Sequence, residues 1–339
     1  MARSSRAHYV PFGFDFQINA GIILMIENID HFSSLRLEGH YEDIEIQLDN
    51  GKYILAQAKS VVKACSDFSN VREKLKEGLR TLSKGSKDID IEKLIYITNS
   101  PNPLKDESHN IFLGEQSHRM YNTLPEGSQK LIADYLKSMD LSLDLNKFMI
   151  QVFQFETDEP LERYKVVEKC VDYFISELRL SVPNLTRRVL SVWHKHVFIN
   201  SSTSNPDIVL TKKDIIWPII VIITETKDIP EDLDDRIDES LYEDIVHNYR
   251  DLINNCSENY ALFIKVIHDY TEYKESSNFS KKIKSFIDNK WQEYVSEFNI
   301  DEIEDLDEDL KIGLTKTILY KILANRRDID KVKRRLNIQ

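Results

Sequence analysis

Residues 37–60, LEGHYEDIEIQLDNGKYILAQAKS, constrain the fold of this chain more than any other stretch. Residues 43–48 alternate polar and apolar side chains, and residues 52–59 are rich in β-compatible types. Asp49-Asn50-Gly51 lies between these two runs and is a turn signal. The pattern predicts a β-hairpin, in which two antiparallel strands are joined by a tight connection.

The length of the turn decides which side chains share a face of this hairpin. A two-residue turn at Asn50-Gly51 pairs position 43 with 58, whereas a three-residue loop with a left-handed Gly51 pairs 43 with 57. A register change of one residue moves every side chain to the opposite face. We favour the three-residue loop, because it places glycine where a left-handed residue is needed. One face then carries Asp43, Glu45, Gln57 and Lys59, and the other carries Ile44, Ile46, Ile54, Ala56 and Ala58.

The polar face of this hairpin has two interpretations. A face with carboxylates, a carboxamide and a lysine is most often the solvated side of an antiparallel sheet. However, Asp43 followed by Gln57-Ala58-Lys59 resembles the PD-(D/E)XK nuclease signature in its Q-x-K variant. The surrounding sequence resembles the double-stranded-DNA endonuclease domain of CD-NTase-associated and Lamassu-type antiphage effectors, with related domains in HerA-associated systems. The resemblance covers residues 12–160 and is specific around 38–60.

The resemblance implies a metal-dependent DNA endonuclease, and the chemistry of phosphodiester hydrolysis explains its residue types. A divalent cation neutralises phosphate oxygens and lowers the pKa of an attacking water, and Mg²⁺ or Mn²⁺ prefers oxygen ligands. By resemblance, Asp43, the Gln57 side chain and the Ala58 carbonyl would bind this cation. Lys59 would orient the water or stabilise charge on phosphorus.

The chain departs from the parent signature at Gln57, where most of the superfamily has Asp or Glu. A carboxamide is neutral, so one unit of ligand charge is missing. Glu45, on the same predicted face, would compensate and is included among the catalytic residues. Glu27, at the end of a predicted helix over 17–29, matches a position where many such nucleases place another acid, and is a further candidate metal ligand.

The charge of the chain is unevenly distributed. The net charge is −12, yet residues 59–87 hold eight basic and three acidic side chains. A helix predicted over 68–82 would present cations to DNA phosphates, and a solvated helix without a ligand is the alternative. The residues predicted to contact DNA are Lys63, Arg72, Lys76 and Arg80. The acidic stretches 225–251 and 301–309 would instead face solvent, a basic partner or the basic surface of the nuclease itself.

The order of predicted elements indicates an α/β nuclease fold, with a mixed central sheet flanked by helices, followed by a mainly α-helical domain. We expect a helix over 14–29, a strand over 33–37, the hairpin, a helix over 68–82, a strand over 93–98, a helix over 128–139 and a strand over 147–156. Residues 156–160 are the expected domain boundary, which separates an endonuclease domain (1–156) from an assembly or regulatory domain (157–339). Thr211 and Asp214 form a predicted capping box at the start of a helix over 212–224.

The sequence also predicts the surroundings of the protein. The first residues show no secretory signal, and the longest apolar stretch is too short for a membrane span. The three cysteines fit neither a disulfide framework nor a zinc site. We therefore expect a cytoplasmic protein that acts on double-stranded DNA. By resemblance it would form a homo-oligomer or be controlled by an SMC-like or HerA-like ATPase. The competing hypothesis is that the protein is a catalytically silent DNA-binding or scaffolding subunit.

Overall fold

The computed structural model describes residues 9–64, 66–87, 89–106, 111–156, 158–180, 182–225, 239–274, 279–303, 306–324 and 326–336. They form two compact units, one made of residues 1–177 and 186–215 and the other of residues 178–185 and 216–339. Residues 226–238 of the predicted acidic stretch 225–251, and residues 304–305 of 301–309, lie outside the described residues. The predicted boundary at 156–160 falls inside the first unit, which therefore extends further along the chain than expected.

The first unit contains a seven-stranded mixed sheet with the strand order β5-β6-β4-β3-β2-β1-β7. β3 runs parallel to β4 and β4 parallel to β6, whereas the remaining neighbours are antiparallel. The strands are β1 (Phe32–Leu37), β2 (Ile44–Leu48), β3 (Tyr53–Lys59), β4 (Ile91–Thr98), β5 (Gln116–Met120), β6 (Phe148–Phe153) and β7 (Leu210–Thr211). β5 and β7, the two edge strands, were not predicted, because neither carries the period-two pattern of a half-buried strand.

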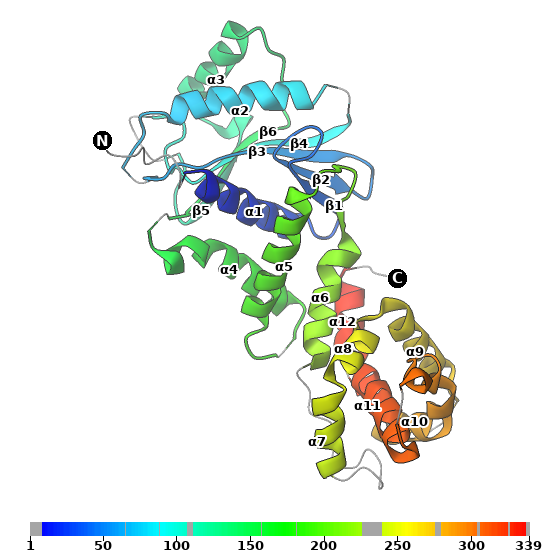
Figure 1. The fold of residues 1–339 in the computed structure, drawn as a ribbon. Coiled ribbons are helices and arrows are strands. Elements are labelled where there is room, and N and C mark those ends of the chain that lie inside the picture. Colours follow the sequence, from blue (N-terminus) through cyan, green and yellow to red (C-terminus); the bar gives the residue numbers. More distant parts are fainter. Residues whose placement is uncertain are drawn as a thin grey trace. The chain divides into compact units, whose positions relative to one another are not determined.

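Helices cover both faces of this sheet, as Figure 1 shows: α2 and α3 lie on one face, and α1, α4 and α5 on the other. The elements are α1 (Tyr9–Glu27), α2 (Val71–Gly85), the short 3-10 helix η2 (Tyr121–Thr123), α3 (Glu126–Ser138), α4 (Pro160–Glu177) and α5 (Leu185–Ser202). The predicted α/β architecture with a mixed sheet and flanking helices is thus confirmed.

α1 is a core helix. Its side chains from Ile22 to Met25 are almost completely buried, and the Phe16 ring stacks on Phe153 of β6 with centroids 4.7 Å apart. Residues 10–27 are also long and apolar enough to cross a membrane. The burial of this helix against the sheet accounts for the same apolar composition without a membrane.

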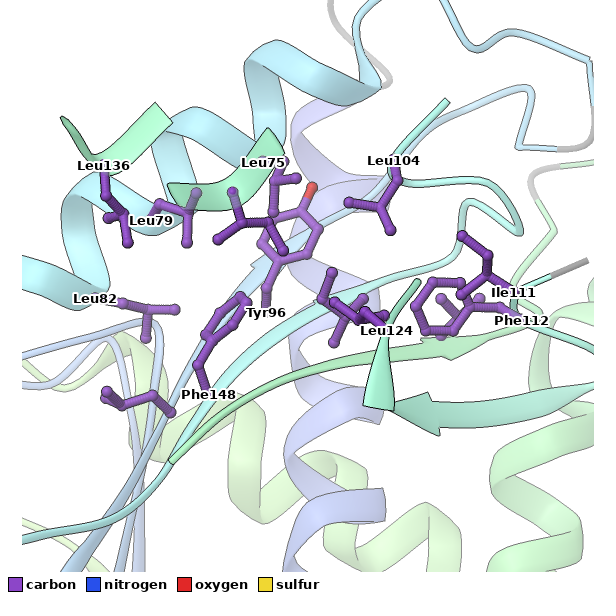
Figure 2. Packing of buried hydrophobic residues seen from close by; sticks show 14 of the residues in the cluster. Leu75, Leu79, Leu82, Tyr96, Leu104, Ile111, Phe112, Leu124, Leu136 and Phe148 are labelled. Atoms are coloured by element: carbon purple, nitrogen blue, oxygen red, sulfur yellow. The ribbon is translucent and has the colours of Figure 1, made fainter. Parts of the chain in front are cut away.

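The core between the sheet and α2 and α3 is built by leucines and aromatic residues. Figure 2 shows Leu75, Leu79 and Leu82 of α2 lying over Tyr96 and Phe148 of the sheet. These leucines recur at intervals of three and four residues, which places them on one face of the helix. The packing fixes how α2 lies on β3 and β4, and so where its polar side chains meet the ends of these strands.

Gly78 allows α2 to lie close to the sheet. A Cβ atom at position 78 would lie 2.5 Å from Cδ2 of the buried Tyr96 ring. We predict that Gly78→Ala lowers the free energy of unfolding by about 1–3 kcal/mol through overpacking, although alanine is the better helix former by about 1 kcal/mol. Denaturant unfolding measures the change.

Gly127 of α3 is the matched control for this substitution, because a Cβ there would meet no atom within 4 Å. Gly127→Ala should raise the free energy of unfolding by about 0.5–1 kcal/mol. Stabilisation by both substitutions would show that the approach of α2 to Tyr96 is not tight.

The second unit is helical, as predicted for the C-terminal region. Its elements are the larger part of α6 (Lys212–Glu225), α7 (Glu239–Asn248), α8 (Arg250–Glu258), α9 (Tyr260–Glu272), α10 (Phe279–Val295), the 3-10 helix η3 (Ile300–Glu302), α11 (Glu308–Ala324) and α12 (Arg326–Leu336). α11 is the central helix and packs against α7, α8, α9 and α10. The Thr211–Asp214 capping box is confirmed, since Asp214 Oδ2 accepts a hydrogen bond from the Thr211 amide at 2.8 Å.

Candidate active site

The hairpin has the register that the three-residue loop requires. Ile44 pairs with Ala56, so position 43 faces position 57, and Gly51 is left-handed with φ +82°. Asp43 lies directly before β2, where its Oδ2 accepts hydrogen bonds from Gln57 Nε2 and, at 3.1 Å, from the Ala58 amide. The sequence prediction that Asp43 and Gln57 meet is therefore confirmed.

Lys59 ends β3 and supplies the positive charge of this cluster. It is half-buried, pairs with Thr98 of β4, and acts electrostatically on Glu38, Glu42 and Asp43. The predicted grouping of Asp43, Gln57 and Lys59 thus forms at the carboxyl end of β3.

Three carboxyl groups gather around this lysine. Withdrawal from water raises the pKa of Asp43, although Lys59, Gln17 and the Ala58 amide act in the opposite direction. Withdrawal from water, followed by the charge of Asp43, raises the pKa of Glu38 and also that of Glu42, the latter to about 8. Clusters of carboxyl groups with displaced pKa values are typical of functional sites.

The pKa of Glu42 predicts how the metal-free protein responds to pH. Because the folded state holds this proton more tightly than the unfolded state, the resulting stability is present at low pH and is lost as the pH rises from about 4.5 to about 8. Asp43 and Glu38 act in the same direction. In EDTA, the melting temperature of the wild type should therefore fall relative to that of Glu42→Gln between about pH 5 and pH 8.

Thermal melts followed by circular dichroism at several pH values check this prediction. Glu126→Gln, on the exposed first turn of α3, is the control and should follow the wild type. A constant difference between wild type and Glu42→Gln over this range would contradict the assignment of the titrating group.

Two helices complete the cluster with polar groups that the sequence patterns did not single out. Gln17 of α1 hydrogen-bonds with the carboxylates of Asp43 and Glu38. The Thr81 hydroxyl of α2 hydrogen-bonds with Gln57 Oε1 and with the carboxyl group of Glu42. The one available signal was that Gln17 is one of the few polar residues in a mostly apolar helix, where a polar side chain needs a partner.

Glu45 has a different role from the one predicted. It lies on the expected face, but its Oε1 accepts hydrogen bonds from the amides of Tyr41 and Glu42, the latter at 3.0 Å. Gly39 passes so close that a Cβ there would lie 2.3 Å from the Glu45 carboxyl carbon. Glu45 therefore holds the loop that leads to Asp43 and is a positioning residue.

Glu27 is not brought to the site. Its carboxylate accepts hydrogen bonds from Gln116 at 2.6 Å and Gln151 at 3.0 Å, on β5 and β6. Glu27 follows Gln17 by ten residues, which is roughly 15 Å along a helix. The prediction therefore selected a residue at the wrong end of α1. Gln17, nearer the start of the helix, is the α1 side chain that reaches Asp43.

The structure also separates most of the predicted DNA-binding residues from the site. Arg72 Nε donates to Leu104 O at 2.9 Å, Lys76 Nζ pairs with Glu73 at 2.8 Å, and Arg80 Nη2 contacts Met139 Sδ at 3.6 Å. These three residues follow one side of α2. At 100° per residue, they lie roughly 100–180° around the helix from Thr81.

Two other lysines lie near the end of β3, namely Lys74 on the Thr81 side of α2 and Lys63 in the turn after the strand. Lys74 Nζ donates to the Ser60 carbonyl at 2.7 Å, directly after β3, and burial followed by the charge of Lys59 lowers its pKa. Lys63 is exposed in the turn after β3. Hydrogen bonds from Ser69, and to a lesser extent the charges of Lys63 and Lys74, lower the pKa of Asp67. Of the residues predicted to contact DNA, Lys63 is the one in the turn after β3, the strand that carries Gln57 and Lys59.

The donor atoms at the site suit a hard divalent cation. Within the described ranges, no group of three or more His, Cys, Asp or Glu side chains is arranged to hold a metal ion. The donors here are of mixed type, namely the Asp43 carboxylate, the Gln57 amide and the Ala58 carbonyl, all of which offer oxygen. A half-turn of the Gln57 amide exchanges its nitrogen and oxygen, which brings Oε1 to Asp43 and leaves Nε2 as a donor to Thr81.

No protein-family model matches this chain, and neither a curated protein nor a solved structure matches it.

Proposed function

We propose that this protein is a metal-dependent DNA endonuclease with its active site at the carboxyl end of β3. The observation that carries the proposal is the meeting of Asp43, Gln57 and Lys59 at one point. The other possible hairpin register would have turned Asp43 away from both partners. The carboxylates with raised pKa values around Lys59 support a site adapted to chemistry rather than a solvated sheet face.

Each residue of the site would have a separate role in phosphodiester hydrolysis. Asp43, Gln57 and the Ala58 carbonyl would hold Mg²⁺ or Mn²⁺, and the bound cation would neutralise phosphate oxygens and acidify water. Lys59 would place its ammonium group beside the phosphate and stabilise the negative charge that develops there. Gln17, Glu45 and Thr81 would keep these groups in position through the hydrogen bonds described above.

The biological role follows from the resemblance of residues 38–60 to nuclease domains of antiphage effectors. Uncontrolled cleavage would damage the host genome, so such an enzyme needs restraint. The helical unit of residues 178–185 and 216–339 would provide assembly or contact with an SMC-like or HerA-like ATPase, in the cytoplasm, as part of a homo-oligomer or a mixed complex.

A catalytically silent DNA-binding or scaffolding subunit is the second candidate. It is favoured by the neutral Gln57, whose amide is already hydrogen-bonded to Asp43 and Thr81. In that case the same residues would form a closed polar network without a cation.

Titration of divalent ions with purified full-length protein and supercoiled plasmid tests the proposal. We expect nicked and linear DNA with Mg²⁺ or Mn²⁺, none in EDTA, and none with Asp43→Asn, which keeps the shape of the side chain and removes its charge. Binding of DNA without cleavage at any cation concentration would favour the silent subunit. Matched single-stranded DNA and RNA substrates measure the preference for nucleic acid.

A further inference from the structure

Glu42 is a buried carboxyl group that the Thr81 hydroxyl, the Asp43 amide and the charge of Lys59 satisfy only in part. Only 7 % of the residue is exposed, and its Oε1 has no hydrogen-bond partner among the residues that the structure describes. A buried anion is costly unless it is paired or binds a cation. The unpaired oxygen of Glu42, buried beside Asp43, is therefore a position that a bound cation would satisfy.

The surroundings of Glu42 direct its side chain to the site. The Thr81 hydroxyl contacts both Glu42 and the Gln57 amide, so the two side chains are neighbours across one oxygen atom. Asp43, the next residue, raises the pKa of Glu42 through its charge. Gly85, one turn after Thr81 on α2, also packs against Glu42, since a Cβ there would lie 3.4 Å from Glu42 Cγ.

The neighbouring acids differ from Glu42 in this respect. Glu45 is satisfied by the amides of Tyr41 and Glu42, and Glu38 is exposed and hydrogen-bonded with Gln17. Among these acids, Glu42 combines burial, closeness to Asp43 and an oxygen without a partner. It is also one residue away from the aspartate that holds the cation in the proposed site.

We infer that Glu42 is a ligand of the divalent cation and supplies the negative charge that the neutral Gln57 lacks. The inference rests on the proposed function, because the cation is the one that Asp43 and Gln57 would hold. With Asp43 and Glu42 together, the site carries two carboxylates, as in nucleases that have an acid in place of Gln57. A Gln at position 57 is then compatible with catalysis.

Direct measurement of cation binding tests this inference without reference to cleavage. Mn²⁺ binding to the full-length protein is followed by electron paramagnetic resonance and by calorimetry, for the wild type, Glu42→Gln and Glu38→Gln. Loss of a ligand should weaken Mn²⁺ binding at least as much as loss of an outer-shell group, on the order of 10–100-fold. Glu38→Gln removes the same charge from a more exposed neighbour and should weaken binding by about threefold at most.

The outcomes separate this inference from the proposed function. Equal Mn²⁺ affinity in Glu42→Gln and the wild type, or equal losses in Glu42→Gln and Glu38→Gln, would overturn the role of Glu42 while leaving metal-dependent cleavage untouched. A wild type that does not bind Mn²⁺ would overturn both. Mn²⁺ binding that depends on Glu42, without DNA cleavage, would support the inference and refute the nuclease.

Folding of the variants is checked independently of the metal. Glu42→Gln removes a buried charge, so its melting temperature in EDTA at about pH 8 should equal or exceed that of the wild type, while the rise on adding Mn²⁺ should be lost. Glu42→Asp keeps the charge with a shorter side chain and should retain more of that rise than Glu42→Gln. Equal rises in Glu42→Gln and the wild type would contradict the inference.

Discussion

Replacement of Lys59 by methionine should reduce metal-dependent DNA cleavage by a factor on the order of 10²–10³, the usual cost of losing one charge-stabilising group in an active site. Methionine keeps the length and apolar stem of lysine and removes only the ammonium group. Lys59 is the positive charge that acts on Asp43, Glu38 and Glu42 together. Single-turnover cleavage of plasmid at saturating Mg²⁺ measures the loss.

Lys63→Met is the matched control, because it removes the same charge four residues later, from an exposed turn. It should weaken DNA binding slightly and leave the rate at saturating DNA nearly unchanged. Mn²⁺ binding should persist in Lys59→Met, since lysine is not a ligand. Similar rates for the two variants would place the catalytic charge elsewhere.

Replacement of Arg36 by methionine should destabilise the first unit by roughly 3 kcal/mol, because buried carbonyl groups lose a charged donor. The Arg36 side chain of β1 is 3 % exposed. Its guanidinium donates to the carbonyls of Asn200 at 2.7 Å, Thr203 at 2.8 Å and Ile208 at 3.0 Å. A single side chain thus ties the end of α5 and the segment before β7 to the sheet.

Thermal and denaturant unfolding measure this loss, which corresponds to about 6–12 °C in melting temperature for a domain of this size. Arg119→Met is the control. Arg119 is exposed on β5 and donates to the Ile111 carbonyl at 3.2 Å, so its loss should cost less than about 1 kcal/mol. Equal losses in the two variants would show that residues 200–208 do not depend on Arg36.

Long-range contacts like those of Arg36 also explain why the domain boundary was predicted too close to the N-terminus. Residues 156–160 have the polar, proline-containing composition of a linker, yet α4 returns to α1, where the Tyr164 hydroxyl donates to Asp15 Oδ2 at 2.9 Å. His194 of α5 lies 3.1 Å from the same carboxyl group. Such contacts join residues about 150–180 positions apart in the chain. They cannot be predicted from local composition.

The sequence by itself determined the hairpin and the first three members of the site. Alternation of side chains identifies the strands, and the need of Gly51 for a left-handed conformation selects the register that joins Asp43 to Gln57. These are local properties, because positions 43 to 59 are linked through one short turn. The mixed sheet with helical layers and the helical C-terminal region followed from periodicity in the same way.

Only the tertiary structure decided which further side chains join the site. Period-two alternation placed Glu45 on the right face but could not show that backbone amides use its carboxylate, or that Glu42 lies buried beside Thr81. Gln17 rather than Glu27 reaches Asp43 because the packing of α1 on the sheet determines the position of this helix along the strands. The positions of such groups depend on contacts between segments distant in the chain, and these contacts form only when the helices pack on both faces of the sheet.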